Sequence, residues 1–277
     1  MTVELSGREL ARIIRAAVAD DAAALTRAGR QPRLAVVSAT DDGGSAAYVR
    51  SLANAAAKEG IACDVARTTT AGGIVATLAQ LADDPEVHGI ILQSPVPAGA
   101  NLADLAAAIP AAKDVDGASP ESLGRLMAGL PAFAPATAEA VLTMLDHYQV
   151  QLRGRHAVVV GRSVVVGKPV AHLLLARHST VTICHSRTAD LPAITRQADV
   201  LVAAVGRVGL IGPGHVSSGT TVIDVGMNAT SGGGLAGDVD PAVREVAAAL
   251  TPVPGGVGPV TTALLLRHVV QAASAAV

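Results

Sequence analysis

One stretch of about thirty residues restricts the fold more than any other part of the chain. Residues 157–186 read AVVVGRSVVVGKPVAHLLLARHSTVTICHS: an apolar run, a turn containing glycine, a helical pattern and a second apolar run. A strand, a helix and a returning parallel strand occupy about 30 residues, the length of one βαβ unit. The stretch therefore predicts a parallel sheet covered by helices.

The turn inside this stretch contains two glycines, Gly161 directly after the strand and Gly167 at the start of the helix. Glycine lets the backbone approach a diphosphate closely, and the free N–H groups at a helix start favour negative charge. Arg162 and Ser163 lie in the same turn, and we include both in a predicted nucleotide site. The spacing differs from G-x-G-x-x-G, so a plain tight turn is the alternative.

The residues after the second strand favour NADP over NAD. Sheets that bind NAD usually end this strand with Asp or Glu, which holds the ribose 2′-hydroxyl. This chain has His185, Ser186 and Arg187 there. Hydroxyl and guanidinium groups suit a 2′-phosphate, and Arg162 adds a second positive charge nearby. We therefore expect NADP as the cofactor, with merely solvated Arg162 and Arg187 as the alternative.

Strand-like and helix-like segments alternate along the rest of the chain. After the loop 39–44, Ser45 is expected to cap a helix. The alternation predicts an α/β protein with parallel sheets. Before the βαβ stretch, strands are expected at 33–38, 61–66 and 88–93, and helices at 7–29, 45–59, 74–83, 101–108, 120–128 and 137–148.

A domain border is expected at the basic, glycine-containing segment LRGRH, residues 152–156. A length of 277 residues suits two domains, because domains most often have about 100 to 150 residues. Beyond the border, further apolar strands at 199–205 and 220–226 continue a doubly wound sheet. The second half of the chain is therefore predicted to be Rossmann-like.

Charge and hydropathy limit the partners that this chain can have. Its net charge is −2, and Lys and Arg do not gather on any face, so the footprint of nucleic-acid binding is missing. No apolar stretch approaches the roughly 18 to 20 residues that span a bilayer. The start, MTVELSGREL, lacks the form of a secretory signal. We expect a cytoplasmic protein that binds small molecules, not nucleic acid or membrane.

The cysteines and histidines do not indicate a metal site. Cys63 and Cys184 lie far apart in motifs without metal-ligand spacing, which predicts reduced thiols with a packing role. His185 beside Cys184 is an isolated pair, and H-E-x-x-H is absent. No metal is therefore expected.

Five short motifs follow one another in the order of one known family. They read SAAYVRS at 45–51, ILQSPVPAG at 91–99, KDVDG at 113–117, GRSVVVGKP at 161–169 and TPVPGGVGP at 251–259. With these motifs the chain resembles the methylenetetrahydrofolate dehydrogenase/cyclohydrolase family from end to end. The resemblance implies an N-terminal α/β folate-binding domain, 1–140, completed by the last helix, 261–277. It further implies a Rossmann-like NADP-binding domain, 141–260, a cleft between the domains, and a homodimer.

The activity implied by the resemblance has two steps on a tetrahydrofolate derivative. NADP accepts a hydride from 5,10-methylenetetrahydrofolate, and water then opens the methenyl cation to 10-formyltetrahydrofolate. The family builds its folate pocket from a Y-x-x-x-K helix, the Gln of a Q-x-P-x-P loop and the last Asp of K-D-V-D-G. The matching residues here are Tyr48, Gln93 and Asp116. Tyr48 would stack on the aromatic middle of the folate, and Asp116 would accept hydrogen bonds from the pterin.

Three further residues complete the predicted substrate site. Ser94 follows Gln93 in the Q-x-P-x-P loop, and Gly255 with Gly256 would let the chain pass beside the cofactor. Simple alternatives exist for several of these positions. Tyr48 as a core tyrosine, Asp116 as a loop cap and the glycines as ordinary turn residues would each explain the residue without a ligand.

The position of the family's catalytic lysine is occupied by Leu52, one helical turn after Tyr48. Hydride transfer needs the reacting carbon and the nicotinamide held in line, so positioning is its main requirement. Hydration and ring opening move protons, and losing a general acid–base commonly costs about 10² to 10⁴ in rate. Leu52 has no proton to give, so we expect an NADP-dependent dehydrogenase with weak or absent cyclohydrolase activity.

Two other readings remain open at this point. The protein could keep the fold and bind folate or nucleotide without useful turnover. It could also act on a different folate-like or imine substrate, with Leu52 packing on that substrate. Formation of NADPH from methylenetetrahydrofolate would exclude the first reading.

Overall fold

The structure is a computed structural model that describes residues 2–40, 43–230 and 232–276. Its backbone contacts divide the chain into two compact units. The small-sheet unit combines Arg12–Ala136 with the C-terminal residues from Thr262 onward, and the large-sheet unit combines the N-terminal residues through Ala11 with Thr137–Thr261. Part of the expected loop 39–44, residues 41 and 42, lies outside the described residues.

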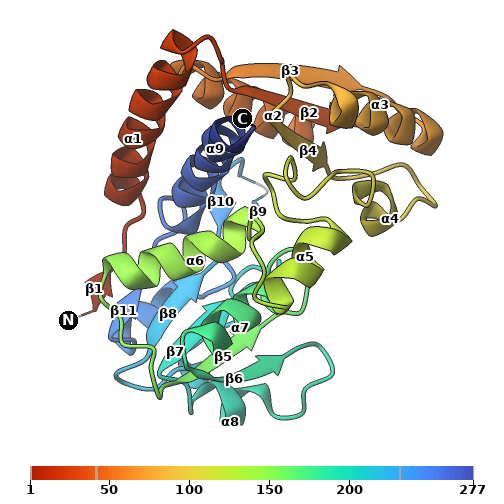
Figure 1. The fold of residues 1–277 in the computed structure, drawn as a ribbon. Helices are drawn as coiled ribbons and strands as arrows, with labels where there is room; N and C mark the ends of the chain where they lie inside the picture. Colours follow the sequence, from red (N-terminus) through yellow and green to blue (C-terminus); the bar gives the residue numbers. More distant parts are fainter. Residues whose placement is uncertain (1, 41–42, 231, 277) are drawn as a thin grey trace. The chain divides into compact units, whose positions relative to one another are not determined.

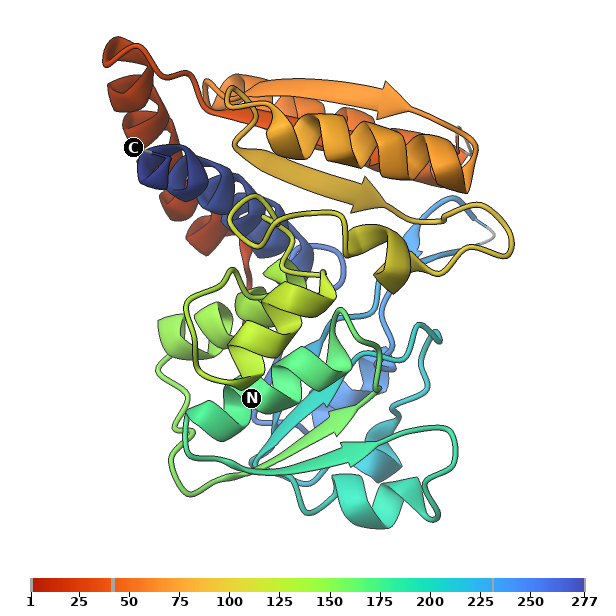
Figure 2. The same ribbon diagram turned by 45° about the vertical axis from the view of Figure 1, so that its right-hand side comes forward.

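The small-sheet unit is built on three parallel strands in the order β3-β2-β4. They are β2 (Arg33–Ser38), β3 (Ala62–Arg67) and β4 (Gly89–Gln93), and the apolar run of β2 is almost wholly buried. Parallel strands need crossover connections, which α2 (Gly43–Lys58) and α3 (Ala71–Asp83) provide. The two helices cover opposite faces of the sheet (Figures 1 and 2).

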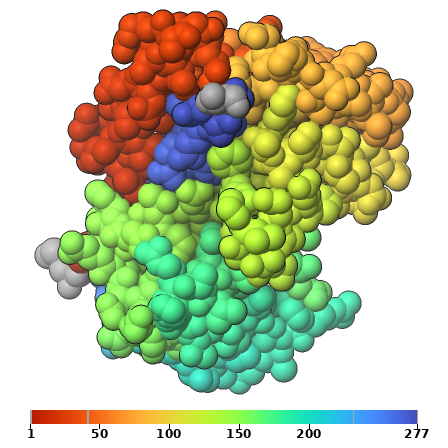
Figure 3. Space-filling model, viewed as in Figure 1, coloured from red at the N-terminus to blue at the C-terminus, as the bar shows by residue number. Residues whose placement is uncertain are grey.

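Helices enclose the rest of this unit. The long helix α1 (Arg8–Arg27) runs beside α9 (Val257–Ala275) in both ribbon views (Figures 1 and 2). The leucines of α9 are buried, whereas α1 forms a broad ridge of the surface in Figure 3. The amphipathic pattern of α1 explains this difference, since only one of its faces is apolar. Two shorter helices, α4 (Leu102–Ala106) and α5 (Pro120–Met127), complete the unit.

The large-sheet unit contains six parallel strands in the order β1-β11-β8-β7-β5-β6. Helix α7 packs on β5 and β6, as the βαβ stretch predicts, and β9 with β10 forms a separate antiparallel pair. The bounds are β1 Val3–Glu4, α6 Ala136–His147, β5 His156–Val160, α7 Gly167–Ala176, β6 Thr180–Cys184, α8 Leu191–Thr195, β7 Val200–Ala203, η1 Pro213–His215, β8 Thr221–Asp224, β9 Asn228–Ala229, β10 Leu235–Ala236, η2 Pro241–Glu245 and β11 Ala249–Leu250.

Each sheet reverses its strand order once. In the large sheet the chain moves from β5 outward to β6 and then returns to β7 on the other side. In the small sheet it moves from β2 to β3 and then returns to β4. Ligands of open α/β sheets bind beyond the carboxyl ends of the strands at such reversals. The ends of β5 and β7, and those of β2 and β4, are therefore the first places to look for sites.

The predicted α/β class with parallel sheets is confirmed, and two local expectations are corrected. Helix α2 begins at Gly43, so Ser45 lies inside the helix, where its hydroxyl donates to the carbonyl of Ser94 at 3.2 Å instead of capping the helix. The short strand β1 was not expected from the sequence and pairs with β11. Within the described ranges, no helix is both long and apolar enough to cross a bilayer.

Candidate functional site

The carboxyl ends of β2 and β4 carry the first group of predicted residues. Gln93 ends β4, opposite Ser38 at the end of β2, and its side-chain amide donates to the carbonyl oxygen of Ser94 at 2.9 Å. The same carbonyl accepts the Ser45 hydroxyl from α2. This shared acceptor ties the Q-x-P-x-P loop to the helix that carries Tyr48.

Tyr48 and Leu52 lie on α2 in different environments. Tyr48 is partly exposed, and burial, followed by the charge of Asp116, raises its pKa to about 12. The phenol therefore keeps its proton at every physiological pH. Leu52 is 1 % exposed and shares the buried face of α2 with Val49 and Ala56. Position 52 thus holds an apolar core side chain close in sequence to a polar, partly open tyrosine.

The segment KDVDG runs beside β4, and the side chains of its first two residues bind backbone groups. The Lys113 ammonium donates to the carbonyl oxygens of Leu81, Ala82 and Asp84, at 3.3, 2.7 and 2.6 Å, around the end of α3. The Asp114 carboxylate, which is buried, accepts the backbone N–H groups that lead into α5, namely Ala118 at 3.2 Å and Ser119 at 2.8 Å. The first two charged residues of the motif therefore hold the backbone, and a ligand role for the third, Asp116, stays a prediction.

Asp116 is partly exposed, and its pKa is far from the usual value. Burial, followed by the charge of Asp114, raises its pKa to about 7, and the positive charge of His268 opposes the rise. Gly117 after it has a φ of +63°, and a Cβ there would lie 2.5 Å from the carbonyl oxygen of Phe133. The last residue of the motif must be glycine for this close approach.

Two residues of this site were missed by the sequence reasoning. His268 on α9 is buried, and its Nδ1 lies 2.8 Å from the carbonyl oxygen of Val115. Its ring stacks on Phe133 with centroids 4.7 Å apart. More than a hundred residues separate His268 from Val115 and Phe133 in sequence, so no local motif connects these residues. The available signal was the pair Arg267-His268 between the apolar residues of the segment LLLRHVV.

The glycine turn of the large-sheet unit lies at the reversal between β5 and β7. Gly161 has a φ of +129°, and a Cβ on it would collide with the carbonyl oxygen of Ala204 after β7. A Cβ on Gly167 would collide with the carbonyl oxygen of Gly161. The Ser163 hydroxyl accepts the N–H groups of Val166 and Gly167 at 3.2 and 3.3 Å. This tight packing of helix and strand is the geometry that a diphosphate site needs.

Around the end of β6, His185, Ser186 and Arg187 form a compact turn. The Nδ1 of His185 accepts the Arg187 N–H at 3.1 Å, and the His185 N–H donates to the Thr188 hydroxyl at 2.8 Å. Ser186, Arg187 and Arg162 are exposed. Neither arginine forms an ion pair with a carboxylate of the described residues. A phosphate group would meet two unneutralised guanidinium groups and a hydroxyl here.

The carboxylates of Asp224 and Asp238, which the sequence reasoning also missed, accept hydrogen bonds from the loops after β7 and β8. Asp224 accepts the N–H groups of Gly226, Asp238 and Val239 at 2.9 to 3.0 Å. Burial raises its pKa to about 6, although these hydrogen bonds lower it. Asp238 is fully buried and accepts the N–H groups of Val205, Gly206 and Arg207.

Gly255 and Gly256 have a backbone reason for being glycine. Gly255 has a φ of +108°, and a Cβ on it would lie 2.8 Å from the Arg8 guanidinium. Its carbonyl accepts the Gly7 N–H at 2.8 Å. A Cβ on Gly256 would lie 2.6 Å from the carbonyl oxygen of Pro252. These contacts favour the turn interpretation, and substrate contact by either glycine stays a prediction.

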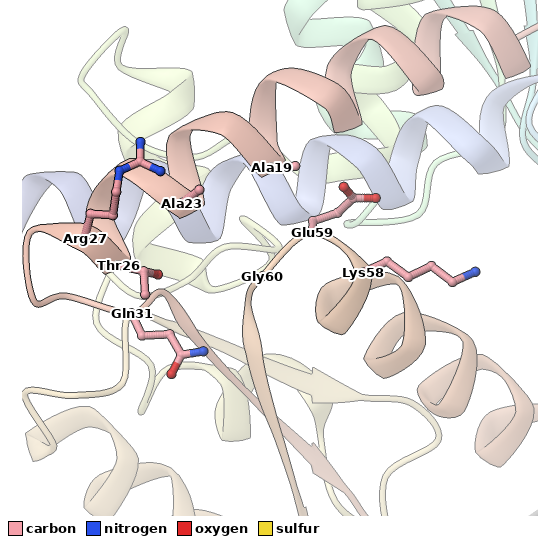
Figure 4. Close-up of a pocket in the computed structure, with 8 residues that line it drawn as sticks. All are labelled: Ala19, Ala23, Thr26, Arg27, Gln31, Lys58, Glu59 and Gly60. Carbon is pink, nitrogen blue, oxygen red and sulfur yellow. The ribbon is translucent and has the colours of Figure 1, made fainter.

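A hollow of about 460 Å³ in the small-sheet unit lies away from all of these residues. Figure 4 shows that its charged side chains, Arg27, Lys58 and Glu59, point in diverging directions. Gln31 and Gly60 on its wall precede β2 and β3, so the hollow is at the amino ends of the strands. Ligands of parallel sheets bind at the opposite ends. We therefore do not assign it as the functional site.

The cysteines are not arranged for chemistry. Both thiols are free, as expected, and Cys184 packs in the core of the large-sheet unit. Burial raises the pKa of Cys63 to about 11 and also raises that of Cys184, so neither forms a thiolate readily. Among the residues that the structure describes, no three His, Cys, Asp or Glu side chains gather as metal ligands would.

The predicted residues thus fall into two groups, one in each compact unit. The small-sheet unit holds Tyr48, Leu52, Gln93, Ser94 and Asp116, with Tyr48 and Asp116 electrostatically coupled. The large-sheet unit holds Gly161, Arg162, Ser163, Gly167, His185, Ser186, Arg187, Gly255 and Gly256.

Family models match both parts of the chain. Residues 5–116 match the tetrahydrofolate dehydrogenase/cyclohydrolase catalytic domain, and residues 135–277 match the NAD(P)-binding domain of the same family. A protein of Saccharopolyspora erythraea named bifunctional protein FolD 1 is 63% identical over 99% of this chain and 94% of its own length. The bifunctional protein FolD of Nocardia farcinica is 56% identical over 98% of each chain.

Solved structures agree over the full length. The bifunctional FolD methylenetetrahydrofolate dehydrogenase/cyclohydrolase of Campylobacter jejuni covers 100% of both chains with a TM-score of 0.97 and 36% identity. The Trypanosoma brucei methylenetetrahydrofolate dehydrogenase-cyclohydrolase, solved with NADP and an inhibitor, has a TM-score of 0.93 and 32% identity over 99% of this chain and 98% of its own.

Proposed function

The chain belongs to the tetrahydrofolate dehydrogenase/cyclohydrolase family, and from that membership we propose an NADP-dependent 5,10-methylenetetrahydrofolate dehydrogenase whose cyclohydrolase activity is weak or absent. The relatives are named as bifunctional proteins, so the proposal departs from their names only in the cyclohydrolase activity. The observation that carries this departure is the leucine at position 52.

Leu52 offers no proton, and neither lysine of the small-sheet unit is placed to replace it. The chain has three lysines, Lys58, Lys113 and Lys168. Lys58 is exposed near the end of α2 and lines the hollow of Figure 4, at the amino ends of the strands. The Lys113 ammonium is bound by three carbonyl oxygens. Lys168 is exposed on α7 of the other unit.

The residues that remain are suited to binding and orienting a folate. Tyr48 offers a flat, partly exposed ring for stacking, and the carboxylate of Asp116 can accept the amide and amino N–H groups of a pterin. Gln93, held by the carbonyl of Ser94, supplies an amide at the end of β4. Hydride transfer from the methylene carbon leaves the methenyl cation and requires no general base. Hydration of that cation releases a proton, which the missing lysine would have handled.

NADP fits the large-sheet unit. The glycine turn with Ser163 would hold the diphosphate, and Arg162, Ser186 and Arg187 would hold the 2′-phosphate. When bound, NADP accepts the hydride. We further propose that residues 1–140 with 261–277 form the folate-binding domain and residues 141–260 the NADP-binding domain, and that the protein is a homodimer, which sedimentation analysis would test.

The decisive experiment measures the two activities separately in the wild type and in Leu52→Lys. NADPH absorbance follows the dehydrogenase, and loss of methenyltetrahydrofolate absorbance follows the cyclohydrolase. We expect the wild type to form NADPH while its cyclohydrolase rate is about 10² to 10⁴ below that of a lysine-bearing relative. Leu52→Lys should raise the cyclohydrolase rate and leave the dehydrogenase within a few-fold.

The matched control is Leu52→Met, because it conserves volume at a buried position and adds no amine. Thermal unfolding of both variants separates a catalytic gain from a change in stability. The proposal fails if the wild type opens the methenyl ring as fast as the relative does. A protein that binds tetrahydrofolate and NADP but never forms NADPH would instead be the non-catalytic homologue.

A further inference from the structure

His268 is a polar side chain in a part of α9, residues 263–270, whose only other polar residue is Arg267. Its neighbours Leu265, Leu266 and Val269 are buried, and His268 itself is 2 % exposed. A buried imidazole is costly unless its polar atoms are hydrogen-bonded. The contacts of His268 therefore indicate what the residue does.

His268 contacts the residue before Asp116 directly and the residue after it through Phe133. On one side, Nδ1 lies 2.8 Å from the carbonyl oxygen of Val115, the residue directly before Asp116. A carbonyl only accepts, so Nδ1 carries a proton and donates it. On the other side, the imidazole stacks on Phe133, whose backbone carbonyl lies against Gly117, the residue directly after Asp116. One ring thus supports the peptide that enters Asp116 and the loop that packs against the peptide leaving it.

His268 also acts on the charge of Asp116, since it lowers the pKa of that carboxyl. The ionisable groups that influence each other here are Tyr48 from α2, Asp114 from the same segment and His268 from α9. The charge of Asp114 raises the pKa of Asp116, and only His268 among these groups lowers it. Lys113 is the nearest lysine in sequence, but its ammonium is bound to the carbonyl oxygens around the end of α3.

We propose that His268 is a positioning residue that aims the Asp116 carboxylate at the adjacent amide and amino N–H groups of a pterin ring. This inference rests on the proposed folate site, and it assigns to α9 a part in substrate recognition that no motif of the sequence marks. The charge of His268 also lowers the pKa of Asp116, which favours the ionised carboxylate, the form that accepts two N–H donors.

The test compares His268→Phe with Val270→Ala. His268→Phe keeps an aromatic ring against Phe133 and removes the donor and the charge, whereas Val270→Ala removes only packing from the same buried helix. We expect His268→Phe to raise the KM for methylenetetrahydrofolate about 10-fold, as loss of a hydrogen bond worth about 1.4 kcal/mol would. The KM for NADP and kcat should stay within about 3-fold.

The pH profile provides a readout that a packing role would not change. Ionised Asp116 binds the pterin, so folate binding should weaken below the pKa of Asp116. In His268→Phe that pKa rises, because the charge of His268 that lowers it is gone, and the acid limb of kcat/KM should move to higher pH. His268→Asn, which keeps a donor without the charge, should recover part of the KM and still show the shifted limb. If His268→Phe does not fold, His268→Asn replaces it in the same measurements.

Direct titration with tetrahydrofolate separates failure of the inference from failure of the proposed activity. A wild type that binds tetrahydrofolate about 10-fold more tightly than His268→Phe supports the inference even if no NADPH forms. An active wild type whose KM and pH profile are unchanged in His268→Phe overturns the inference alone. Equal effects of His268→Phe and Val270→Ala also overturn it. A wild type that does not bind tetrahydrofolate overturns both.

Discussion

Replacing Asp238 by asparagine should loosen the loop after β7 and weaken the nucleotide site. One carboxylate oxygen accepts the N–H groups of Val205 and Gly206, at 2.6 and 3.0 Å. The other accepts the N–H of Arg207 at 2.8 Å and the side-chain amide of Asn228 at 3.0 Å. An asparagine keeps only one oxygen. On the other side its NH₂ group would face two donors.

The magnitude follows from the two donors that lose their acceptor. Leaving a buried donor unsatisfied costs about 1 to 3 kcal/mol, so Asp238→Asn should cost about 2 to 6 kcal/mol. A partial gain offsets this cost, because the charge of Asp238 also raises the pKa of Asp224. We therefore expect a net loss of about 2 to 5 kcal/mol, a large part of the roughly 5 to 15 kcal/mol that stabilises a typical domain.

Two measurements check this prediction. Urea unfolding followed by circular dichroism gives the loss of stability, and it suits a chain without tryptophan. Hydrogen exchange should increase in the peptide that contains Val205, Gly206 and Arg207. Asp240→Asn is the matched control, since Asp240 caps η2 and asparagine caps a helix equally well. If both variants unfold at the same urea concentration and show the same hydrogen exchange, the hydrogen bonds of the Asp238 carboxylate do not stabilise the protein.

Three further outcomes are expected. Ser163→Ala removes the acceptor of the Val166 and Gly167 N–H groups, so the KM for NADP should rise about 5-fold while the KM for the folate does not change; steady-state kinetics with each substrate varied would detect the opposite pattern. Gly117→Ala places a methyl group 2.5 Å from a carbonyl oxygen at a φ of +63°, and thermal unfolding should show a loss of about 2 to 4 kcal/mol. Burial raises the pKa of Asp116 to about 7 in the folded state, so the folded state keeps a proton that the unfolded chain releases near pH 4. The free energy of unfolding should therefore fall as pH rises from about 4 to about 7, and urea titrations across this range should show a smaller fall in Asp116→Asn.

Much of the fold follows from periodicity in the sequence. The apolar runs at β2, β4 and β5 are long enough to be identified as buried strands, and each is followed by a helical pattern. The strand β1 could not be found in this way, because two exposed residues carry no pattern. Helix α2 begins at Gly43, before Ser45, and the Ser45 hydroxyl bonds instead to the Ser94 carbonyl of a distant loop. Such a tertiary partner is invisible to a local capping rule.

The candidate site was predictable only where a motif is local. The motif KDVDG identifies Asp116, and the structure explains why its neighbours are also charged, since Lys113 and Asp114 bind backbone groups. His268 could not be linked to Asp116, because the contact joins α9 to a segment more than a hundred residues earlier. The same is true of Asp238, because three of its four donors are backbone N–H groups over thirty residues away, where residue type leaves no trace.

The scarcity of lysine gives this chain a practical property. The Lys113 ammonium is bound by carbonyl oxygens, so Lys58 and Lys168 are the only exposed lysines among the described residues, and each compact unit carries one. Besides the α-amino group, an amine-reactive dye should therefore label one lysine per unit without any engineered cysteine. Energy transfer between the dyes would then follow movement of one unit against the other during turnover.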